Sequence, residues 1–244
     1  MRKTPISAVL PCFNEGATIS KNIEKIQLYL KSNFETFEII VVNDGSIDNT
    51  LSEIEKIAEI FEIMIVNQPK NYGKGRAVRD GILASHHEIV MFLDADLAIP
   101  IEGLPNFLDS LENGADIAIA SRFVPGLKVL KPVLWYRKFM EHVFRFLRIM
   151  ITNNSGIRDT QCGFKVFKRS AAMAIFPLIT VDRFAFDSEI IFVASKMGFS
   201  IKELPISLQN PTQSHVRIVR DSLNMIKDLL KIRLNDVRGK YKPN

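Results

Sequence analysis

The stretch MFLDADLAIP, residues 91–100, runs from an apolar segment directly into two aspartates and leaves through a proline. The apolar residues from Val90 to Leu93 are typical of the end of a strand that is buried on both faces. Asp94 and Asp96 follow two positions apart, so an extended backbone places both carboxylates on the same side. Two like charges at the end of a buried strand need a cation, a hydrogen-bond network or water to offset their repulsion. The stretch therefore predicts a polar site at the end of a buried strand.

Short apolar runs alternate with amphipathic helical patterns through the first half of the chain. The expected strands are residues 6–10, 38–42, 63–66, 89–93 and 117–120, and the expected helices are residues 17–31, 49–60, 75–84 and 103–111. In the second half, helices are expected over residues 132–152, 168–176, 186–197 and 217–237, and an edge strand over residues 202–208. This alternation predicts an α/β fold with a mostly parallel central sheet flanked by helices. At 244 residues with 47% hydrophobic side chains, the chain is expected to form one domain.

Polar residues follow four of the expected strands. They form the sequences PCFNE (residues 11–15), NDGS (43–46), DADL (94–97) and SRF (121–123). Ligands of parallel sheets collect beyond the carboxyl ends of the strands, and packing alone does not require charged residues there. The clustering predicts a binding or catalytic site at that edge of the sheet.

Composition and motifs exclude several classes of protein. The two cysteines, Cys12 and Cys162, have no ligand-like spacing around them and are expected to be packing thiols of a cytosolic protein. Gly16 stands alone after the first expected strand, so there is no G-x-G-x-x-G motif, and NYGKGRA at residues 71–77 lacks the spacing of a P-loop. No apolar stretch approaches the roughly 20 residues that span a bilayer. We therefore expect a protein that is soluble or lies on a membrane surface.

The net charge of +5 is concentrated near the carboxyl terminus, where residues 215–244 carry eight Lys or Arg and three Asp. A second basic run, residues 128–148, mixes six cations with Leu, Trp, Phe and Met. Such runs are commonly solvated helix faces, but the apolar residues among the cations also fit an anionic surface. A nucleic-acid-binding module would explain the basic runs and leave the acidic strand ends unexplained, so no nucleic acid partner is expected.

The acidic strand ends suit a divalent cation. Mg²⁺ or Mn²⁺ is commonly held by one or two carboxylates together with the phosphates of a substrate, and a D-x-D pair at a strand end supplies such carboxylates. A D-x-D pair by itself is also typical of a solvated turn. The neighbouring Asp44 and the lysines and arginines of the other strand ends favour the metal site.

Several longer motifs resemble a known family in their order and spacing. VLPCFNE (residues 9–15), VVNDGSIDNT (41–50), NYGKGRAVRDG (71–81), FLDADL (92–97) and ASRF (120–123) resemble the family-two inverting glycosyltransferases of the GT-A fold. GIRDTQCGFKVFKRSAA (156–172) and VDRFAFDSEIIFVA (181–194) resemble the dolichyl-phosphate β-glucosyltransferase branch, which is close to the polyprenyl-phosphate mannose synthases. The resemblance implies a single glycosyltransferase domain over residues 1–244, with a nucleotide-sugar-binding half (1–125) and an acceptor- and membrane-facing half (126–244).

The resemblance implies inverting transfer of a hexose, with glucose from UDP-glucose favoured, to a polyprenyl (dolichyl or undecaprenyl) phosphate. A GDP-mannose-dependent mannosyltransferase and a transferase acting on a sugar or protein hydroxyl are the alternatives. Ala98 disfavours mannose transfer, because the mannose synthases of this group have a metal-assisting glutamine at that position. We expect a peripheral enzyme on the cytoplasmic face of the membrane, with the helix in residues 128–148 at the lipid interface.

Individual site residues are also implied by the resemblance. The expected nucleotide-sugar site consists of Pro11, Phe13, Asn14, Glu15, Val42, Asp44, Gly45, Lys74, Asp94, Ala95 and Asp96. Mg²⁺ or Mn²⁺ is expected at Asp94 and Asp96, with Asp96 as the principal ligand, and Asp44 is expected to accept a hydrogen bond from the imide of uracil. The expected acceptor-phosphate contacts are Arg122, Arg137, Lys165 and Arg217. The expected catalytic residues are Asp96, Arg122, Arg137 and Asp187, although Asp187 and Glu189 fit a buried structural pair equally well.

The chemistry of the acceptor explains why arginines are expected in catalytic positions. Most inverting transferases need a carboxylate base to activate a hydroxyl acceptor. A phosphate acceptor is already an anion near neutral pH, so it needs no base. It needs cations that hold it beside the anionic donor, and fork-shaped guanidinium groups suit that task.

Overall fold

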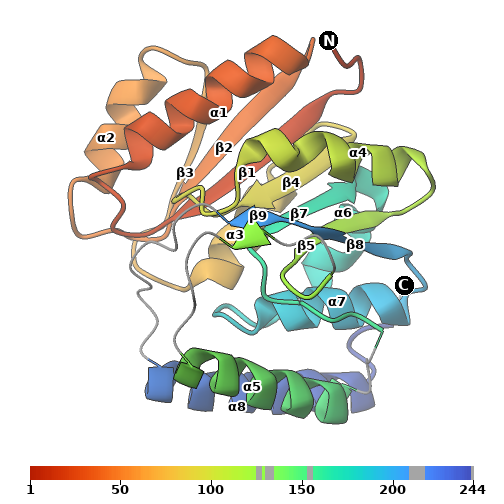
Figure 1. The fold of residues 1–244 in the computed structure, drawn as a ribbon. Helices are drawn as coiled ribbons and strands as arrows, with labels where there is room; N and C mark the ends of the chain where they lie inside the picture. The colour runs from red at the N-terminus through yellow and green to blue at the C-terminus, as the bar shows by residue number, and fades with distance from the viewer. Residues whose placement is uncertain (125–127, 130–134, 153–155, 209–217, 243–244) are drawn as a thin grey trace.

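The computed structural model describes residues 1–124, 128–129, 135–152, 156–208 and 218–242, of which residues 128–129, 135–142, 207–208 and 218–223 are described by their backbone alone. Within this part of the chain, a seven-stranded sheet has the strand order β3-β2-β1-β4-β7-β5-β8 (Figure 1). Its strands are β1 (Ile6–Cys12), β2 (Phe37–Asn43), β3 (Met64–Asn67), β4 (Ile89–Leu93), β5 (Ile117–Ser121), β7 (Phe164–Lys168) and β8 (Ile201–Pro205). A second small sheet pairs β6 (Lys128–Val129) with β9 (Ser207–Leu208) in parallel.

The mostly parallel α/β sheet expected from the sequence is confirmed, with one antiparallel strand that was not expected. β7 lies between β4 and β5 and runs antiparallel to both, while β4 pairs in parallel with β1 and β5 pairs in parallel with β8. The sequence of β7, FKVFK, is short and carries Lys165 in its interior, so it does not show the continuous apolar pattern of a central strand. Because β7 is reversed, its amino end lies at the same edge of the sheet as the carboxyl ends of β4 and β5.

Helices cover both faces of the sheet. They are α1 (Ile19–Asn33), α2 (Thr50–Ala58), α3 (Lys74–Leu83), α4 (Leu104–Glu112), α5 (Trp135–Thr152), α6 (Arg169–Ile175), α7 (Phe186–Lys196) and α8 (Ile218–Val237), with short 3₁₀ turns η1 (Ile101–Gly103) and η2 (Phe176–Leu178). Alternation along the strands divides the core: Ala8 and Leu10 of β1 pack with α1, α2 and α4, whereas Val9 packs with α3, α6 and α7. Burial on both faces explains the continuous apolar strands.

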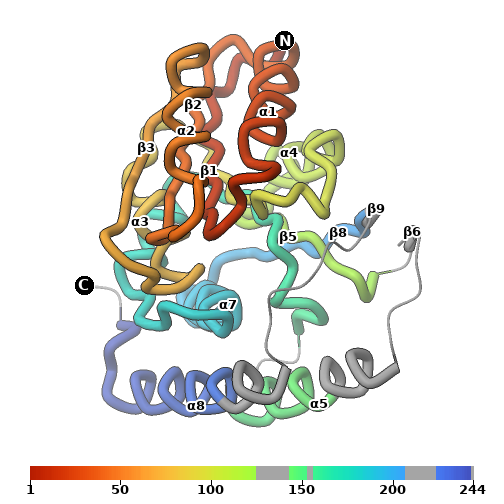
Figure 2. The backbone as a smooth tube through the Cα atoms, turned by 90° about the vertical axis from the view of Figure 1, so that its left-hand side faces the viewer, coloured from red at the N-terminus to blue at the C-terminus, as the bar shows by residue number. Residues whose placement is uncertain are grey.

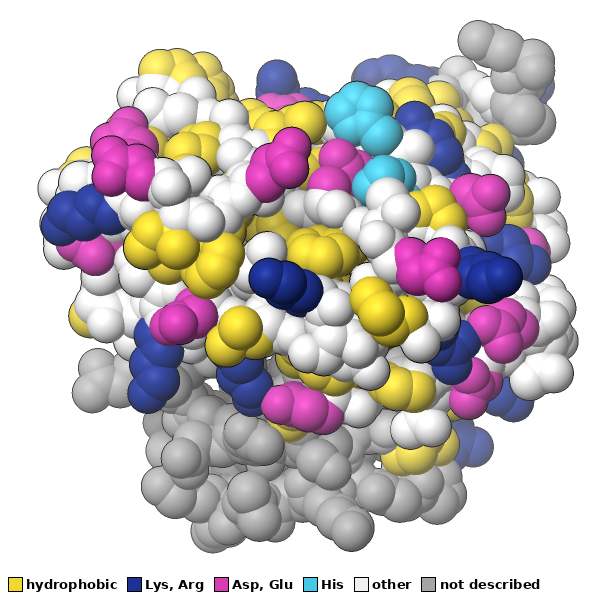
Figure 3. Space-filling model, turned by 90° about the horizontal axis from the view of Figure 1, so that it is seen from above, with side chains coloured by type: hydrophobic (Ala, Val, Ile, Leu, Met, Phe, Trp, Pro, Cys, Tyr) yellow, Lys and Arg dark blue, Asp and Glu magenta, His cyan; other side chains and the backbone are white. Residues whose placement is uncertain are grey.

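α5 and α8 pack side by side and form an outer layer beneath α7, at the end of the molecule away from the N-terminus (Figures 1 and 2). Leu229 and Ile232 of α8 reach the core that α7 lines. Among the described helices, none is both long and apolar enough to cross a bilayer. On the opposite end of the molecule, acidic and basic side chains are interspersed over the surface (Figure 3).

Candidate active site

The DAD turn, residues 94–98, follows β4. One hydrogen bond inside the turn and one from a side chain of α1 hold it in place. Asp96 Oδ1 accepts a hydrogen bond from the backbone N–H of Ala98 at 3.0 Å. Asn22 of α1 donates its amide N–H to the carbonyl oxygen of Ala95 at 2.7 Å. Leu97 has a φ of 51°, a left-handed conformation that is rare for a residue other than glycine. Such strain is commonly found at functional sites, where the surrounding structure holds it in place.

Asp94 lies directly against the backbone at the start of β7. Its N–H donates to the carbonyl oxygen of Gly163 at 3.0 Å. A Cβ at Gly163 would lie 2.0 Å from Asp94 Oδ2, which is far inside van der Waals contact. Only glycine at position 163 therefore allows the carboxylate of Asp94 to occupy this place.

Charges of alternating sign run inward from the DAD turn. Lys74, the first residue of α3, forms an ion pair with Asp94. Behind it, the buried Asp187 at the start of α7 pairs with Lys165 of β7, whose ammonium also donates to the carbonyl oxygen of Cys162 at 2.6 Å. Burial lowers the pKa of the Lys74 ammonium, but attraction by Asp94 and Asp187 outweighs burial and raises the pKa above its ordinary value.

The same arrangement shows what Lys165 and Asp187 do structurally. Burial raises the pKa of Asp187, and the opposing attraction of Lys165 and Lys74 only partly compensates. The side chain of Lys165 is fully buried, with its ammonium 5.1 Å from the ring centroid of Phe92. The expectation that Lys165 contacts the acceptor phosphate does not fit this placement, because its ammonium does not reach the surface. Glu189 is also buried and accepts hydrogen bonds from Thr180.

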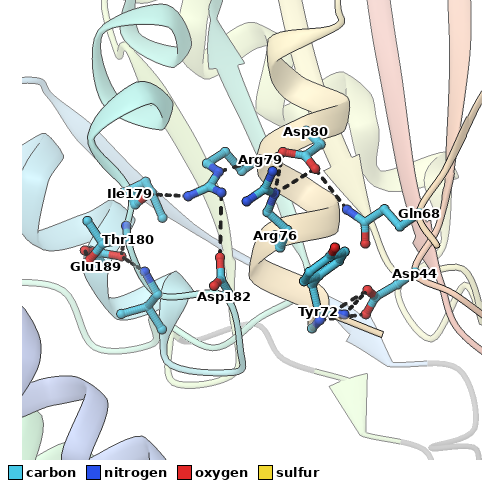
Figure 4. A network of polar contacts seen from close by, with 12 residues as sticks. Asp44, Gln68, Tyr72, Arg76, Arg79, Asp80, Ile179, Thr180, Asp182 and Glu189 are labelled. Atoms are coloured by element: carbon cyan, nitrogen blue, oxygen red, sulfur yellow. Dashed lines mark hydrogen bonds and ion pairs between the residues drawn. The ribbon is translucent and has the colours of Figure 1, made fainter. Parts of the chain in front are cut away.

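α3, which begins at Lys74, is held on both sides by a polar network (Figure 4). On one side, Arg79 donates to the carbonyl oxygen of Ile179 at 2.7 Å. On the other side, Asp80 accepts a hydrogen bond from the amide of Gln68 at 2.9 Å. These contacts join the second half of α3 to both the strand end of β3 and the segment that precedes α7.

Asp44 secures the loop that leads into α3. Its buried carboxylate accepts a hydrogen bond from the N–H of Tyr72 at 2.7 Å (Figure 4). The N–H of Gly73 and the side-chain amide of Asn71 each donate to the same carboxylate at 2.9 Å. Burial raises the pKa of Asp44, and the backbone hydrogen bonds oppose that shift. The N–H of Gly73 also reaches the other carboxylate oxygen at 3.2 Å, so four contacts engage the about four lone-pair positions of Asp44. The expected hydrogen bond from a base would replace one of these contacts.

A cavity of about 410 Å³ opens at the carboxyl ends of β1, β2 and β3. We refer to it as the strand-end cavity; its lining residues are Phe13, Asn43, Gly45, Ser46, Ile47, Leu51, Asn67, Gln68, Pro69, Lys70 and Asn71. Its volume lies in the range of small-molecule sites, roughly 300–1,000 Å³. Gly45 is required here, because its φ is 63° and a Cβ would lie 2.2 Å from the backbone of Lys70.

Four other residues expected in the nucleotide-sugar site, Pro11, Asn14, Glu15 and Val42, do not line this cavity. Pro11 and Val42 are paired across β1 and β2. Asn14 accepts a hydrogen bond from the N–H of Ile47 at 2.9 Å, and the N–H of Glu15 donates to Thr50 Oγ1 at 2.8 Å. These contacts tie the loop after β1 to the loop after β2.

Arg122, immediately after β5, forms a two-pronged ion pair with Asp159. Its Nε and one terminal nitrogen lie 2.8 Å and 3.0 Å from the two carboxylate oxygens. Burial raises the pKa of Asp159, but the guanidinium outweighs it and holds the pKa at about 2. Arg122 and Arg145 of α5 both lie against the ring of Phe123, 5.7 Å and 5.1 Å from its centroid. Two guanidinium groups therefore lie against the same aromatic ring beside the carboxyl end of β5.

Several of these residues were not expected from the sequence, and the side chains of two expected residues lie outside the described part of the chain. Asn22, Gly163 and Asp159 act through contacts with segments far away in the chain, which no local pattern reveals. Arg145 belongs to the basic run of residues 128–148 but has no motif of its own. Arg137 lies in α5 with its side chain outside the described residues, and Arg217 lies wholly outside them.

The residues present fit a divalent cation that is shared with a substrate. Within the described side chains, no group of three or more His, Cys, Asp or Glu converges on one point. Asp94 and Asp96 provide hard oxygen ligands of the kind that Mg²⁺ and Mn²⁺ prefer, and the ammonium of Lys74 already places one positive charge beside them. Other ligands of such an ion would be phosphate oxygens and water.

Comparison with known proteins identifies the family. Residues 7–176 match the family Glycosyl transferase family 2. A dolichyl-phosphate beta-glucosyltransferase of Trichomonas vaginalis is 36% identical over 97% of this chain and 75% of that protein. The dolichyl-phosphate beta-glucosyltransferases of Saccharomyces cerevisiae and Homo sapiens are 33% and 32% identical, over 98% and 97% of this chain and 77% of each relative.

Solved structures confirm the GT-A fold. Glucosyl-3-phosphoglycerate synthase from Mycobacterium tuberculosis, in complex with Mn²⁺, uridine diphosphate and glucosyl-3-phosphoglycerate, superposes with a TM-score of 0.68 over 96% of this chain and 79% of that chain. The two sequences are 20% identical, so this likeness concerns the fold alone. The family match and the relatives together show that the chain is a glycosyltransferase and belongs to glycosyl transferase family 2, among the relatives of the dolichyl-phosphate beta-glucosyltransferases.

Proposed function

We propose that the chain transfers glucose from UDP-glucose to a dolichyl or related polyprenyl phosphate with inversion, as a peripheral enzyme on the cytoplasmic face of a membrane. The observation that carries the proposal is the meeting of three features at one edge of the sheet. These are the strand-end cavity, the DAD turn and the pair of guanidinium groups at Phe123. Relatives that are 32–36% identical over nearly the whole chain bear the name of this activity.

The donor occupies residues 1–125 in this proposal. The nucleoside enters the strand-end cavity, where Asn43, Asn67 and Gln68 offer amide groups to a base and Phe13 offers an aromatic face. The diphosphate extends from there toward Lys74 and the DAD turn. A bound Mg²⁺ or Mn²⁺ supplies electrostatic stabilisation of the leaving nucleoside diphosphate. Lys74, at the amino end of α3, adds a fixed positive charge on the same side.

The acceptor phosphate is held by residues 126–244 together with Arg122. Arg122 and Arg145 provide positive charge beside the reaction site, and Arg137 and Arg217 remain proposed contacts. Asp187, the carboxylate considered as a base for a hydroxyl acceptor, is buried and paired with Lys165. This placement favours a phosphate acceptor, which attacks the anomeric carbon without losing a proton to the protein.

Attachment to the membrane is proposed for the outer face of α5 and α8. Exposed large apolar side chains gather there: Phe146 and Met150 on α5, and Leu230, Leu234 and Val237 on α8. Cations accompany them, namely Lys227, Lys231 and Arg233 on α8 and Arg238 directly after it. A helix face that combines apolar residues with Lys and Arg is typical of helices that lie in the interface of an anionic membrane.

Binding of nucleotides by the purified protein tests the donor part of the proposal. Calorimetry with UDP and GDP in the presence of Mn²⁺ is expected to give the tighter binding for UDP. Transfer from labelled UDP-glucose and GDP-mannose, measured in parallel with dolichyl phosphate in anionic vesicles, is expected to label the lipid only from UDP-glucose. Tighter binding of GDP together with transfer of mannose would assign the chain to the mannose synthases instead.

A further inference from the structure

Lys74 lies where the divalent cation and the donor diphosphate are proposed to meet. Its ammonium pairs with Asp94, and Asp187 and Asp96 also attract it. About three quarters of its side chain is shielded from solvent. α3 is anchored through Arg79 and Asp80, as Figure 4 shows, so the start of the helix holds Lys74 beside the DAD turn.

The buried pair behind Lys74 directs its charge toward the DAD turn. Asp187 already has a full counter-charge in Lys165, which is completely buried and has no route to another anion. Asp94 is the carboxylate with which Lys74 forms its ion pair, and the attraction by Asp187 and Asp96 adds to it. The carboxylates and ammonium groups of this row together carry a net charge of −1; the row consists of Asp94, Asp96, Asp187, Lys74 and Lys165.

The net charge of this row of carboxylates and ammonium groups changes sign when a divalent cation binds without a nucleotide. A bound M²⁺ would bring the row from −1 to +1 and would place two cations against each other beside Asp94. A nucleoside diphosphate that binds together with the metal brings at least two negative charges and restores a negative sum. The site is thus electrostatically matched to a metal and a diphosphate together, and mismatched to the metal alone.

We propose that Lys74 is a built-in counter-ion of the DAD turn that makes binding of the divalent cation depend on the nucleoside diphosphate. In the free protein the ammonium neutralises Asp94 and opposes the metal. When a nucleoside diphosphate binds, the ammonium turns to its phosphate oxygens, and the carboxylate of Asp94 is released to the metal or the sugar. This inference rests on the proposed function, because it assumes a metal-dependent nucleoside diphosphate donor.

The expected effect of Lys74 is large enough to measure. In a water-like dielectric, a unit positive charge about 5 Å from a divalent cation weakens binding of that cation by roughly tenfold. Loss of the ion pair with Asp94 on metal binding acts in the same direction. Lys74→Met removes the charge and keeps most of the apolar stem, so the free protein is expected to bind Mn²⁺ at least about tenfold more tightly.

The experiment measures Mn²⁺ affinity by electron paramagnetic resonance or calorimetry, with and without UDP, for the wild type and three variants. Lys74→Arg keeps the charge and is expected to bind Mn²⁺ as the wild type does. Lys56→Met removes one exposed cation from a surface pair with Glu53, so it controls for the change in net charge and is expected to leave Mn²⁺ affinity unchanged. Circular dichroism and thermal unfolding establish that each variant is folded.

UDP is expected to raise the Mn²⁺ affinity of the wild type strongly and that of Lys74→Met much less, since the coupling between the two ligands is reciprocal. If Lys74→Met binds Mn²⁺ no more tightly than the wild type in the absence of UDP, the inference is overturned while the proposed function stands. If the wild type binds neither UDP nor Mn²⁺, both the proposed function and the inference about Lys74 fail.

Discussion

Replacing Asp159 by asparagine tests the structural basis of the proposed acceptor site. Asp159 is almost fully buried, and its carboxylate accepts two hydrogen bonds from the guanidinium of Arg122. It accepts a third from the backbone N–H of Arg122 at 2.9 Å. Asparagine has nearly the same shape but carries no charge and has only one acceptor oxygen. Asp159→Asn is therefore expected to destabilise the fold and to release Arg122 from its fixed orientation.

The magnitude follows from the pKa of Asp159, which falls from 3.8 to about 2 in the folded protein. Each pKa unit corresponds to about 1.36 kcal/mol, so the ionised carboxylate contributes about 2.5 kcal/mol to the free energy of unfolding at pH 7. Because the folded pKa is depressed, this contribution is present above pH 3.8 and is lost as the pH falls toward 2. About half of it, roughly 1.3 kcal/mol, remains at pH 3.

The assay is urea unfolding of the wild type and Asp159→Asn at pH 7 and pH 3. The difference in unfolding free energy is expected to shrink from about 2.5 to about 1.3 kcal/mol between these pH values. Asp109→Asn is the matched control, because Asp109 forms an exposed ion pair with Arg2 and its loss is expected to change stability by less than about 1 kcal/mol. A difference for Asp159→Asn that is close to zero, or that does not depend on pH, would refute the reasoning.

Two further predictions concern the donor site and the membrane face. Gly163→Ala is expected to displace the carboxylate of Asp94 and to abolish binding of UDP with Mn²⁺ in calorimetry, whereas Gly103→Ala, where a Cβ meets nothing within 4 Å, is expected to bind normally. Normal ligand binding by Gly163→Ala would contradict the placement of Asp94. Phe146→Ser and Leu234→Ser are expected to keep the fold, because both side chains are exposed, and to weaken sedimentation with anionic vesicles by roughly tenfold each. Unchanged sedimentation would exclude this face as the membrane contact.

The expected parallel strands and their acidic ends agree with the structure because local patterns determine both. Continuous apolar runs such as that of β4 are required by burial on two faces, and the residues that follow them lie at one edge of the sheet. Asp44, Asp94 and Arg122 could therefore be placed at that edge without knowledge of the tertiary contacts.

The roles of other residues depend on contacts between distant segments, which the sequence does not display. Lys165 resembles a surface cation within a short apolar run, but Asp187, 22 positions away, neutralises it in the interior. Gly163 precedes β7 without any turn signature, and the close approach of Asp94 alone explains its need for a glycine. Asp159 and Asn22 likewise acquire their roles from Arg122 and Ala95.

The most direct test of the proposed function compares two acceptors that differ only in the phosphate. Purified protein receives labelled UDP-glucose and Mn²⁺ with anionic vesicles that contain either dolichyl phosphate or dolichol, and the label is extracted into organic solvent. The account predicts a β-linked glucosyl phosphate lipid from dolichyl phosphate and no labelled lipid from dolichol, because the site provides cations for a phosphate and no exposed carboxylate base at Asp187. Labelled product from dolichol, or none from dolichyl phosphate, would contradict it.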